Sequence, residues 1–90
     1  MSATAEDFES ELVALFRLAE QHQRGSIDIR AGDLHRRTGD YPGTDHRMPL
    51  CCLVMRKHMR PGDRVVAEPP RGAGASLTIR YVLPRTPAAS

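Results

Sequence analysis

The sequence has no tryptophan, few aromatic residues and no long run of apolar residues. A helix that spans a membrane needs about 20 consecutive apolar residues, so we expect no membrane segment. The amino terminus is acidic and has no hydrophobic stretch, which argues against a signal peptide. We therefore predict an intracellular, cytoplasmic protein. Its 90 residues are enough for one domain with one small core.

Cysteine is also scarce, because the chain has only the adjacent Cys51 and Cys52. Two neighbouring thiols form no disulfide framework and fit a reducing compartment. His35, His46 and His58 lie close in the sequence, but the CxxC or HxxxH spacing typical of a zinc site is absent. Both thiols are expected on the apolar side of a helix, where thiolate formation is disfavoured. We predict no enzyme, with no catalytic residue, metal site or cofactor.

The charge is unevenly distributed along the chain. Residues 1–25 carry five acidic and two basic residues, a net charge of −3. Residues 26–90 carry eleven basic and six acidic residues, a net charge of +5. This asymmetry predicts an anionic partner for the basic part.

The first predicted helix begins near residue 5 and ends near Gly25. Thr4 is the expected N-cap, and Asp7 at the third helical position approximates a capping box. Apolar residues recur at helical spacing on one face, while the other face is acidic and should point away from any nucleic acid. The apolar residues are Phe8, Leu12, Leu15 and Ala19, and Val13, Phe16 and Leu18 widen the stripe.

Two short elements should follow this helix. Residues 26–29 alternate and are β-branched, which predicts a brief strand that pairs with a later hairpin. Asp28 or a neighbouring residue is the expected cap of a second helix over residues 31–38. Gly39 should end that helix.

Residues 40–45 predict a turn, since Tyr-Pro-Gly lies between Asp and Thr residues. A third helix is expected from about residue 48 to 59, with Pro49 in its first turn. We assign a broad apolar face to this helix and a cationic face to its other side. The apolar face comprises Leu50, Cys51, Leu53, Val54 and Met55.

The last part of the chain predicts a hairpin. Its strands are residues 64–68 and 76–83, and the connection 69–75 is rich in Pro and Gly. In the second strand, alternation at period two places four apolar residues on one face. These residues are Leu77, Ile79, Tyr81 and Leu83.

This order of elements resembles that of the winged helix-turn-helix superfamily over about residues 5–84. The resemblance implies an α+β winged-helix fold with three helices, a short first strand and a C-terminal two-stranded wing hairpin. Residues 1–4 and 85–90 would then be a disordered amino terminus and tail. The predicted turn between the second and third helices is longer than the usual three or four residues.

The resemblance also implies that the protein binds duplex DNA as a bacterial or phage transcriptional regulator or DNA-recognition module. The third helix would enter the major groove, and Arg71 at the wing tip would enter the minor groove. With six to eight cations on one surface, we expect affinity to fall roughly 10³-fold or more between 50 and 200 mM salt. The candidate DNA-binding residues are His46, Arg47, Arg56, Lys57, Arg60, Arg71, Arg80, Arg36 and Arg37.

Two other interpretations remain open at this point. The cations can form an ordinary solvated face, or the winged helix can be a protein-interaction module within a larger assembly. In the second case Val66, Val82 or Leu53 should be exposed instead of a continuous basic surface. We also expect either a homodimer, formed through Val13, Phe16 and Leu18 of the first helix, or a partner protein.

Overall fold

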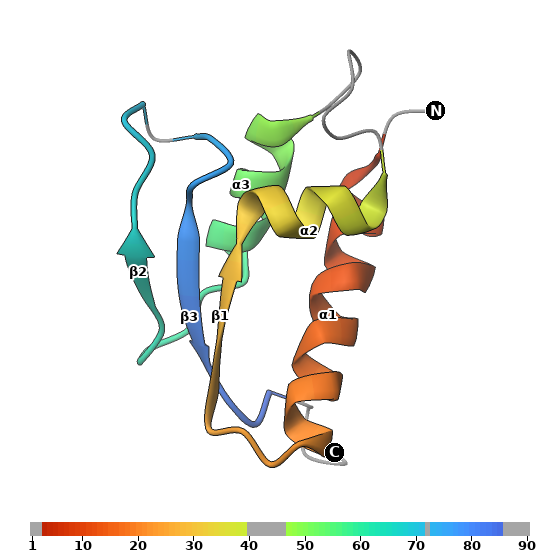
Figure 1. Cartoon of the computed structure of the whole chain (residues 1–90), viewed down its shortest axis with the longest axis vertical. Coiled ribbons are helices and arrows are strands. Elements are labelled where there is room, and N and C mark those ends of the chain that lie inside the picture. The colour runs from red at the N-terminus through yellow and green to blue at the C-terminus, as the bar shows by residue number, and fades with distance from the viewer. Residues whose placement is uncertain (1–2, 40–46, 72, 86–90) are drawn as a thin grey trace.

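The computed structural model describes residues 3–39, 47–71 and 73–85, which form three helices and a three-stranded antiparallel sheet (Figure 1). This small α+β fold confirms the predicted fold class at that level. Within the described residues, none of the helices combines the length and apolar character needed to span a membrane. The elements are α1 (Ala5–Gln21), β1 (Ser26–Arg30), α2 (Ala31–Thr38), α3 (Met48–Lys57), β2 (Arg64–Ala67) and β3 (Thr78–Val82).

Helix α1 begins with the predicted capping box. The Asp7 N–H donates to Thr4 Oγ1 at 3.2 Å, and the Thr4 N–H donates to Asp7 Oδ2 at 2.9 Å. The expectation of a disordered amino terminus is therefore wrong for Thr4 and for Ala3, which is buried. The helix ends four residues before Gly25, because Gln23 adopts a left-handed conformation with a φ of 58°.

Strand β1 leads directly into α2, and no side chain caps this helix. Its first N–H groups are instead satisfied by the segment before β3. The Ala31 N–H donates to Leu77 O at 2.7 Å, and the Gly32 N–H donates to Ala75 O at 3.0 Å. The expected capping by Asp28 is therefore wrong. Gly39 ends α2 as predicted, with a φ of 101° that favours glycine.

The sheet has the order β1-β3-β2, so β1 pairs with the later hairpin as predicted. A register irregularity between Val65 and Ala67 interrupts the pairing of β2 with β3. The alternation predicted for the last strand is confirmed. One face of this segment is buried at Leu77, Ile79, Tyr81 and Leu83.

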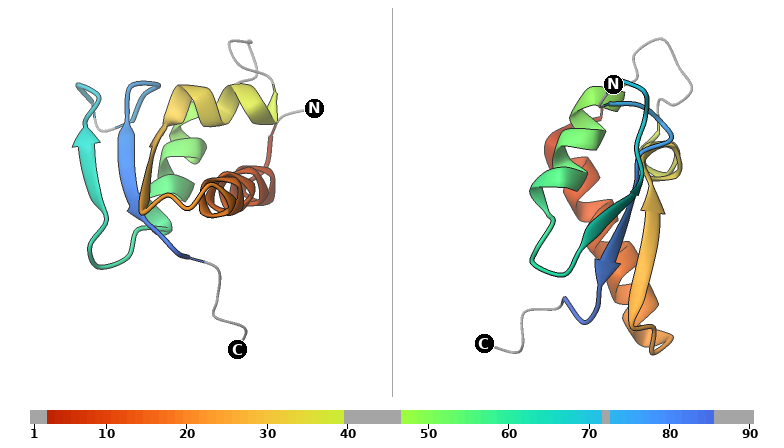
Figure 2. Two further views of the ribbon diagram at one scale, coloured as in Figure 1. Left: turned by 60° about the horizontal axis from the view of Figure 1, so that its bottom comes forward. Right: turned by 90° about the vertical axis from the view of Figure 1, so that its left-hand side faces the viewer.

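Helices α1 and α3 lie against one face of the sheet, and none of the described helices covers the other face (Figure 2). The Tyr81 hydroxyl donates to Met55 O at 2.8 Å and so joins β3 to α3. Phe16 is buried edge-to-face against Tyr81, with ring centroids 4.9 Å apart. Phe16 therefore belongs to the core of the monomer and is not available for the expected dimer contact, whereas Leu18 is 48% exposed.

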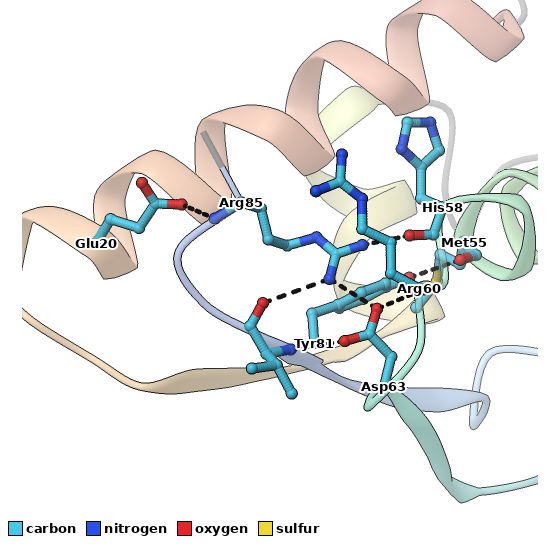
Figure 3. Close-up of polar contacts among 8 residues, drawn as sticks. Glu20, Met55, His58, Arg60, Asp63, Tyr81 and Arg85 are labelled. Atoms are coloured by element: carbon cyan, nitrogen blue, oxygen red, sulfur yellow. Dashed lines mark hydrogen bonds and ion pairs between the residues drawn. The ribbon is translucent and has the colours of Figure 1, made fainter. Parts of the chain in front are cut away.

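The carboxyl end of the described chain is also part of the fold. Arg85, which we assigned to a disordered tail, is only 7% exposed. Its guanidinium donates to Asp63 Oδ2 at 2.7 Å and to the carbonyl of His58, as Figure 3 shows. Arg85 therefore joins the segment after β3 to the turn between α3 and β2.

Candidate nucleic-acid interface

The outer side of α3 is set by helical spacing. Five residues face the core: Met48, Cys51, Cys52, Val54 and Met55. On the opposite side, Pro49, Leu53 and Lys57 follow one another at intervals of four and are all exposed. Leu53, which we assigned to the apolar face, is 61% exposed at the centre of this row. The outer side of α3 is therefore apolar at Pro49 and Leu53 and basic at its carboxyl end.

The described residues of the loop 68–77, which are 68–71 and 73–77, pack against α3 and α2. Cys52 Sγ lies 3.4 Å from both the N and the O of Gly74. Gly32 permits the close approach of α2, since a Cβ added there would lie 3.1 Å from Ala75 Cβ. Pro69 is buried, whereas Arg71 is exposed. The loop is thus a docked segment with an exposed middle, and not a freely projecting wing.

An ion pair links α3 to the start of this loop. Arg56 Nη2 lies 2.9 Å from Glu68 Oε1, which places Arg56 and the loop on the same side of the molecule. We use the name α3–loop face for Leu53, Arg56 and Lys57 of α3 together with Glu68 and Arg71 of the loop. Arg71 also lines a hollow with Arg30 of β1. The α3–loop face carries three cations and one carboxylate, and Arg47 adds an exposed cation at the amino end of α3.

Three predicted DNA-binding residues lie away from this face. Arg80 points to the face of the sheet opposite α3, because its neighbour Tyr81 points toward α3. It donates to the two carboxylate oxygens of Asp28 at 2.8 and 3.1 Å, and this hydrogen bonding lowers the pKa of Asp28. Arg37 pairs with Glu11 of α1 at 2.7 Å. Arg60 extends toward α1 (Figure 3).

The two other candidates have different outcomes. Arg36 is exposed on α2, where it lies 3.4 Å from Asp33 Oδ1. Arg36 belongs to α2 and is not one of the residues of the α3–loop face. His46 lies outside the described residues.

Sequence reasoning missed the role of His35, which is fully buried on α2. The Arg47 N–H donates to His35 Nε2 at 2.7 Å, so the ring proton is on Nδ1, which donates to Gly39 O at 3.1 Å. His35 thus connects the end of α2 to the start of α3 and positions Arg47. The signal in the sequence was the position of His35 next to Leu34, since both lie on the buried side of the short helix α2.

The buried thiols have little nucleophilic character. Burial raises the pKa of Cys51 to about 12. Burial also raises the pKa of Cys52, although the hydrogen bond from Gly74 acts in the opposite direction. Within ranges 3–39, 47–71 and 73–85, no three His, Cys, Asp or Glu side chains are placed to hold a metal ion.

This chain matches no family model, curated protein or solved structure. The interpretation of the α3–loop face therefore depends on its own geometry and charge.

Three large apolar side chains named in the protein-binding alternative are exposed: Leu53, Val66 and Val82. Leu53 lies on the outer side of α3. Val82 is in β3 on the face of the sheet opposite α3, since it alternates with the buried Tyr81. Leu53 and Val82 therefore do not belong to one continuous apolar patch. Apolar residues exposed singly are common on protein surfaces.

Proposed function

We propose that this chain is a winged-helix domain that binds duplex DNA through the α3–loop face. The order of its elements and the β1-β3-β2 order of its sheet support the winged-helix assignment. So does the position of the loop 68–77 beside α3, where a wing would flank a recognition helix.

The observation that carries the proposal is the separation of charge between the two sides of the fold. Helix α1 has five acidic residues and one basic residue, a net charge of −4. The α3–loop face together with Arg47 has four basic residues and one acidic residue, a net charge of +3. In Figure 1, α1 and the β2 side of the sheet lie at opposite sides of the molecule. A basic side with an acidic back orients a domain toward a polyanion.

The composition of α3 favours contacts with phosphates over the reading of bases. Bases are read mainly by polar side chains at the amino end and the exposed side of a recognition helix. Here that side presents Pro49 and Leu53, while the cations flank them. Phosphate contacts from Arg47, Lys57 and Arg71, and from Arg56 where a phosphate replaces its partner Glu68, would give binding with little sequence preference. We expect about four such contacts, so affinity should fall about 10²-fold between 50 and 200 mM salt.

Charge reversal tests this proposal directly. Fluorescence anisotropy with random-sequence duplex DNA compares the wild type with Arg71→Glu and Lys57→Glu. We expect each change to weaken binding roughly tenfold or more, because each replaces a phosphate contact with a repulsion. The matched control is Arg24→Glu, which alters net charge equally but lies in the turn after α1.

Two results would contradict the proposal. One is a fall in affinity of less than tenfold across that salt range. The other is an equal loss for the Arg24 control, which would show only a response to total charge.

The exposure of Leu53 favours a second candidate, a winged-helix module that binds another protein. Its exposed apolar side chain lies one helical turn before the cations Arg56 and Lys57, as an anchor for an acidic partner would. The same DNA-binding assay separates the two candidates. Under the first proposal the wild type binds DNA, and Leu53→Asn should leave its affinity for DNA within about twofold. If the wild type fails to bind DNA even at low salt, the second candidate is the one to pursue.

A further inference from the structure

A pocket lies between α1 and the segment that follows α3, away from the α3–loop face. Its volume is about 280 Å³, close to the lower end of the range for small-molecule sites. The side chains come from the middle of α1, from the end of α3 and from the segment after β3. They are Val13, Phe16, Arg17, Glu20, His58, Arg60 and Arg85.

Two of the basic side chains at this pocket already have partners within the protein. Arg85 is paired with Asp63, and its guanidinium lies over the rings of Phe16 and Tyr81 at 4.9 and 5.1 Å. His58 Nε2 lies 3.2 Å from Glu9 Oε2. These contacts account for the presence of both side chains without any ligand.

Arg17 and Arg60 have no such partner in the part of the chain that the structure describes. Among the described residues, neither the Arg17 nor the Arg60 guanidinium forms an ion pair with a carboxylate. The acidic residue of the pocket, Glu20, accepts a hydrogen bond from the Arg85 N–H at 2.8 Å. Figure 3 shows Glu20 and Arg60 on opposite sides of Arg85. The end of the pocket at Arg60 therefore carries a positive charge that no ion pair between described residues neutralises.

We propose that this pocket binds a small organic acid. Its carboxylate or phosphate would lie between Arg17 and Arg60, because the planar guanidinium group donates two parallel hydrogen bonds to either group. Its apolar part would contact Val13 and the edge of Phe16, which form the apolar lining. The bound anion would remove the repulsion between two arginines that open onto one small space.

This site goes beyond the proposed function and does not depend on it. Arg17 and Arg60 are the only residues that the proposal requires to be charged, and neither is in the α3–loop face. Loss of DNA binding and loss of acid binding can therefore be measured separately on the same variants.

The test is an NMR titration of the ¹⁵N-labelled full chain with benzoate. We expect saturable binding with a Kd of roughly millimolar strength, which is the range for a ligand of this size. Shifts should map to the amides around Phe16, Arg17 and Arg60. Inorganic phosphate tests the acid group alone, and benzamide tests the ring without the charge.

The double variant Arg17→Gln/Arg60→Gln should weaken benzoate binding at least tenfold. Arg24→Gln, which removes an exposed cation outside this pocket, should leave it within twofold. Benzamide should not bind measurably. Binding of benzoate that is unchanged in the double variant would overturn the proposal, as would absence of saturation or equal binding of benzamide. Phosphate binding equal to benzoate binding would overturn the assignment of the apolar lining.

Discussion

The two ends of the β2–β3 hairpin are held in place by different kinds of contact. At one end, Asp63 and Arg85 form an ion pair whose side chains are 0% and 5% exposed. At the other end, backbone hydrogen bonds and the contact of Cys52 with Gly74 hold the loop 68–77, while Arg71 is exposed. Arginine thus has two roles in one hairpin. Where its charge is buried and paired it supports the fold, and where it is exposed it is available to a ligand.

The largest expected effect is on stability, through Arg85. Arg85→Ala should lower the free energy of unfolding by about 3–5 kcal/mol, since it leaves the Asp63 carboxylate buried without its partner. Denaturant unfolding followed by circular dichroism measures this loss. Arg71→Ala is the matched control at the other end of the hairpin and should not shift the midpoint. If the variant does not fold, Arg85→Lys should still show a smaller loss. Equal stability of the Arg85 and Arg71 variants would contradict the proposed difference between the two ends of the hairpin.

The next effect is the response to acid. Burial raises the pKa of Asp63, but hydrogen bonds from the Val82 and Arg60 N–H groups and from Arg85 outweigh it, so the pKa is lowered. Because the unfolded value is about 3.9, the stability from this carboxylate is fully present above that pH. It is lost as the pH falls through the lower folded value.

Asp63→Asn should therefore be less stable at pH 7 and should lose less stability than the wild type as the pH falls from about 5 to 2. Urea unfolding at several pH values measures the slope. Asp28→Asn is the control, because its pKa is also lowered but its partner Arg80 is exposed. It should change the slope less than Asp63→Asn does. If the slope of stability against pH is the same in Asp63→Asn as in the wild type, Asp63 does not have a lowered pKa in the folded protein.

Local pattern was sufficient to predict most of the elements. The capping box at Thr4, the stop at Gly39 and the alternation around Ile79 all depend on residues close in the sequence. Arg85 could not be placed in this way. It is followed by a sequence typical of a disordered tail, and its partner Asp63 is 22 residues away.

The candidate site was less predictable than the fold, because exposure and pairing are tertiary properties. The spacing of α3 allowed Leu53 on either side of a wide apolar stripe, and only its packing shows it to be exposed. The residues next to Arg80 in the sequence are those of any alternating strand, so they do not show whether its side chain is paired. Its pairing with Asp28 depends on the register of β1 against β3.

A smaller effect is expected at the contact that docks the loop. Cys52→Ala removes the sulfur atom beside Gly74 and should cost about 1 kcal/mol of stability. Hydrogen exchange at the Gly74 amide should become faster, and DNA affinity should fall severalfold because Arg71 is less well positioned. Cys51→Ala is the control, since Cys51 Sγ contacts Ala31 O instead of the loop. Unchanged exchange at Gly74 would show that the sulfur does not anchor the loop.

The smallest effect should come from Arg80. It lies on the sheet face opposite α3 with its guanidinium on Asp28, so Arg80→Gln should leave DNA affinity within about twofold of the wild type. The same anisotropy assay measures this, beside Arg71→Gln as the matched loss of one exposed cation. A loss as large as that of Arg71→Gln would show that the outer face of the sheet also contacts DNA. The distinction between paired and available arginines would then fail, because an exposed ion pair is weak enough to be replaced by a phosphate.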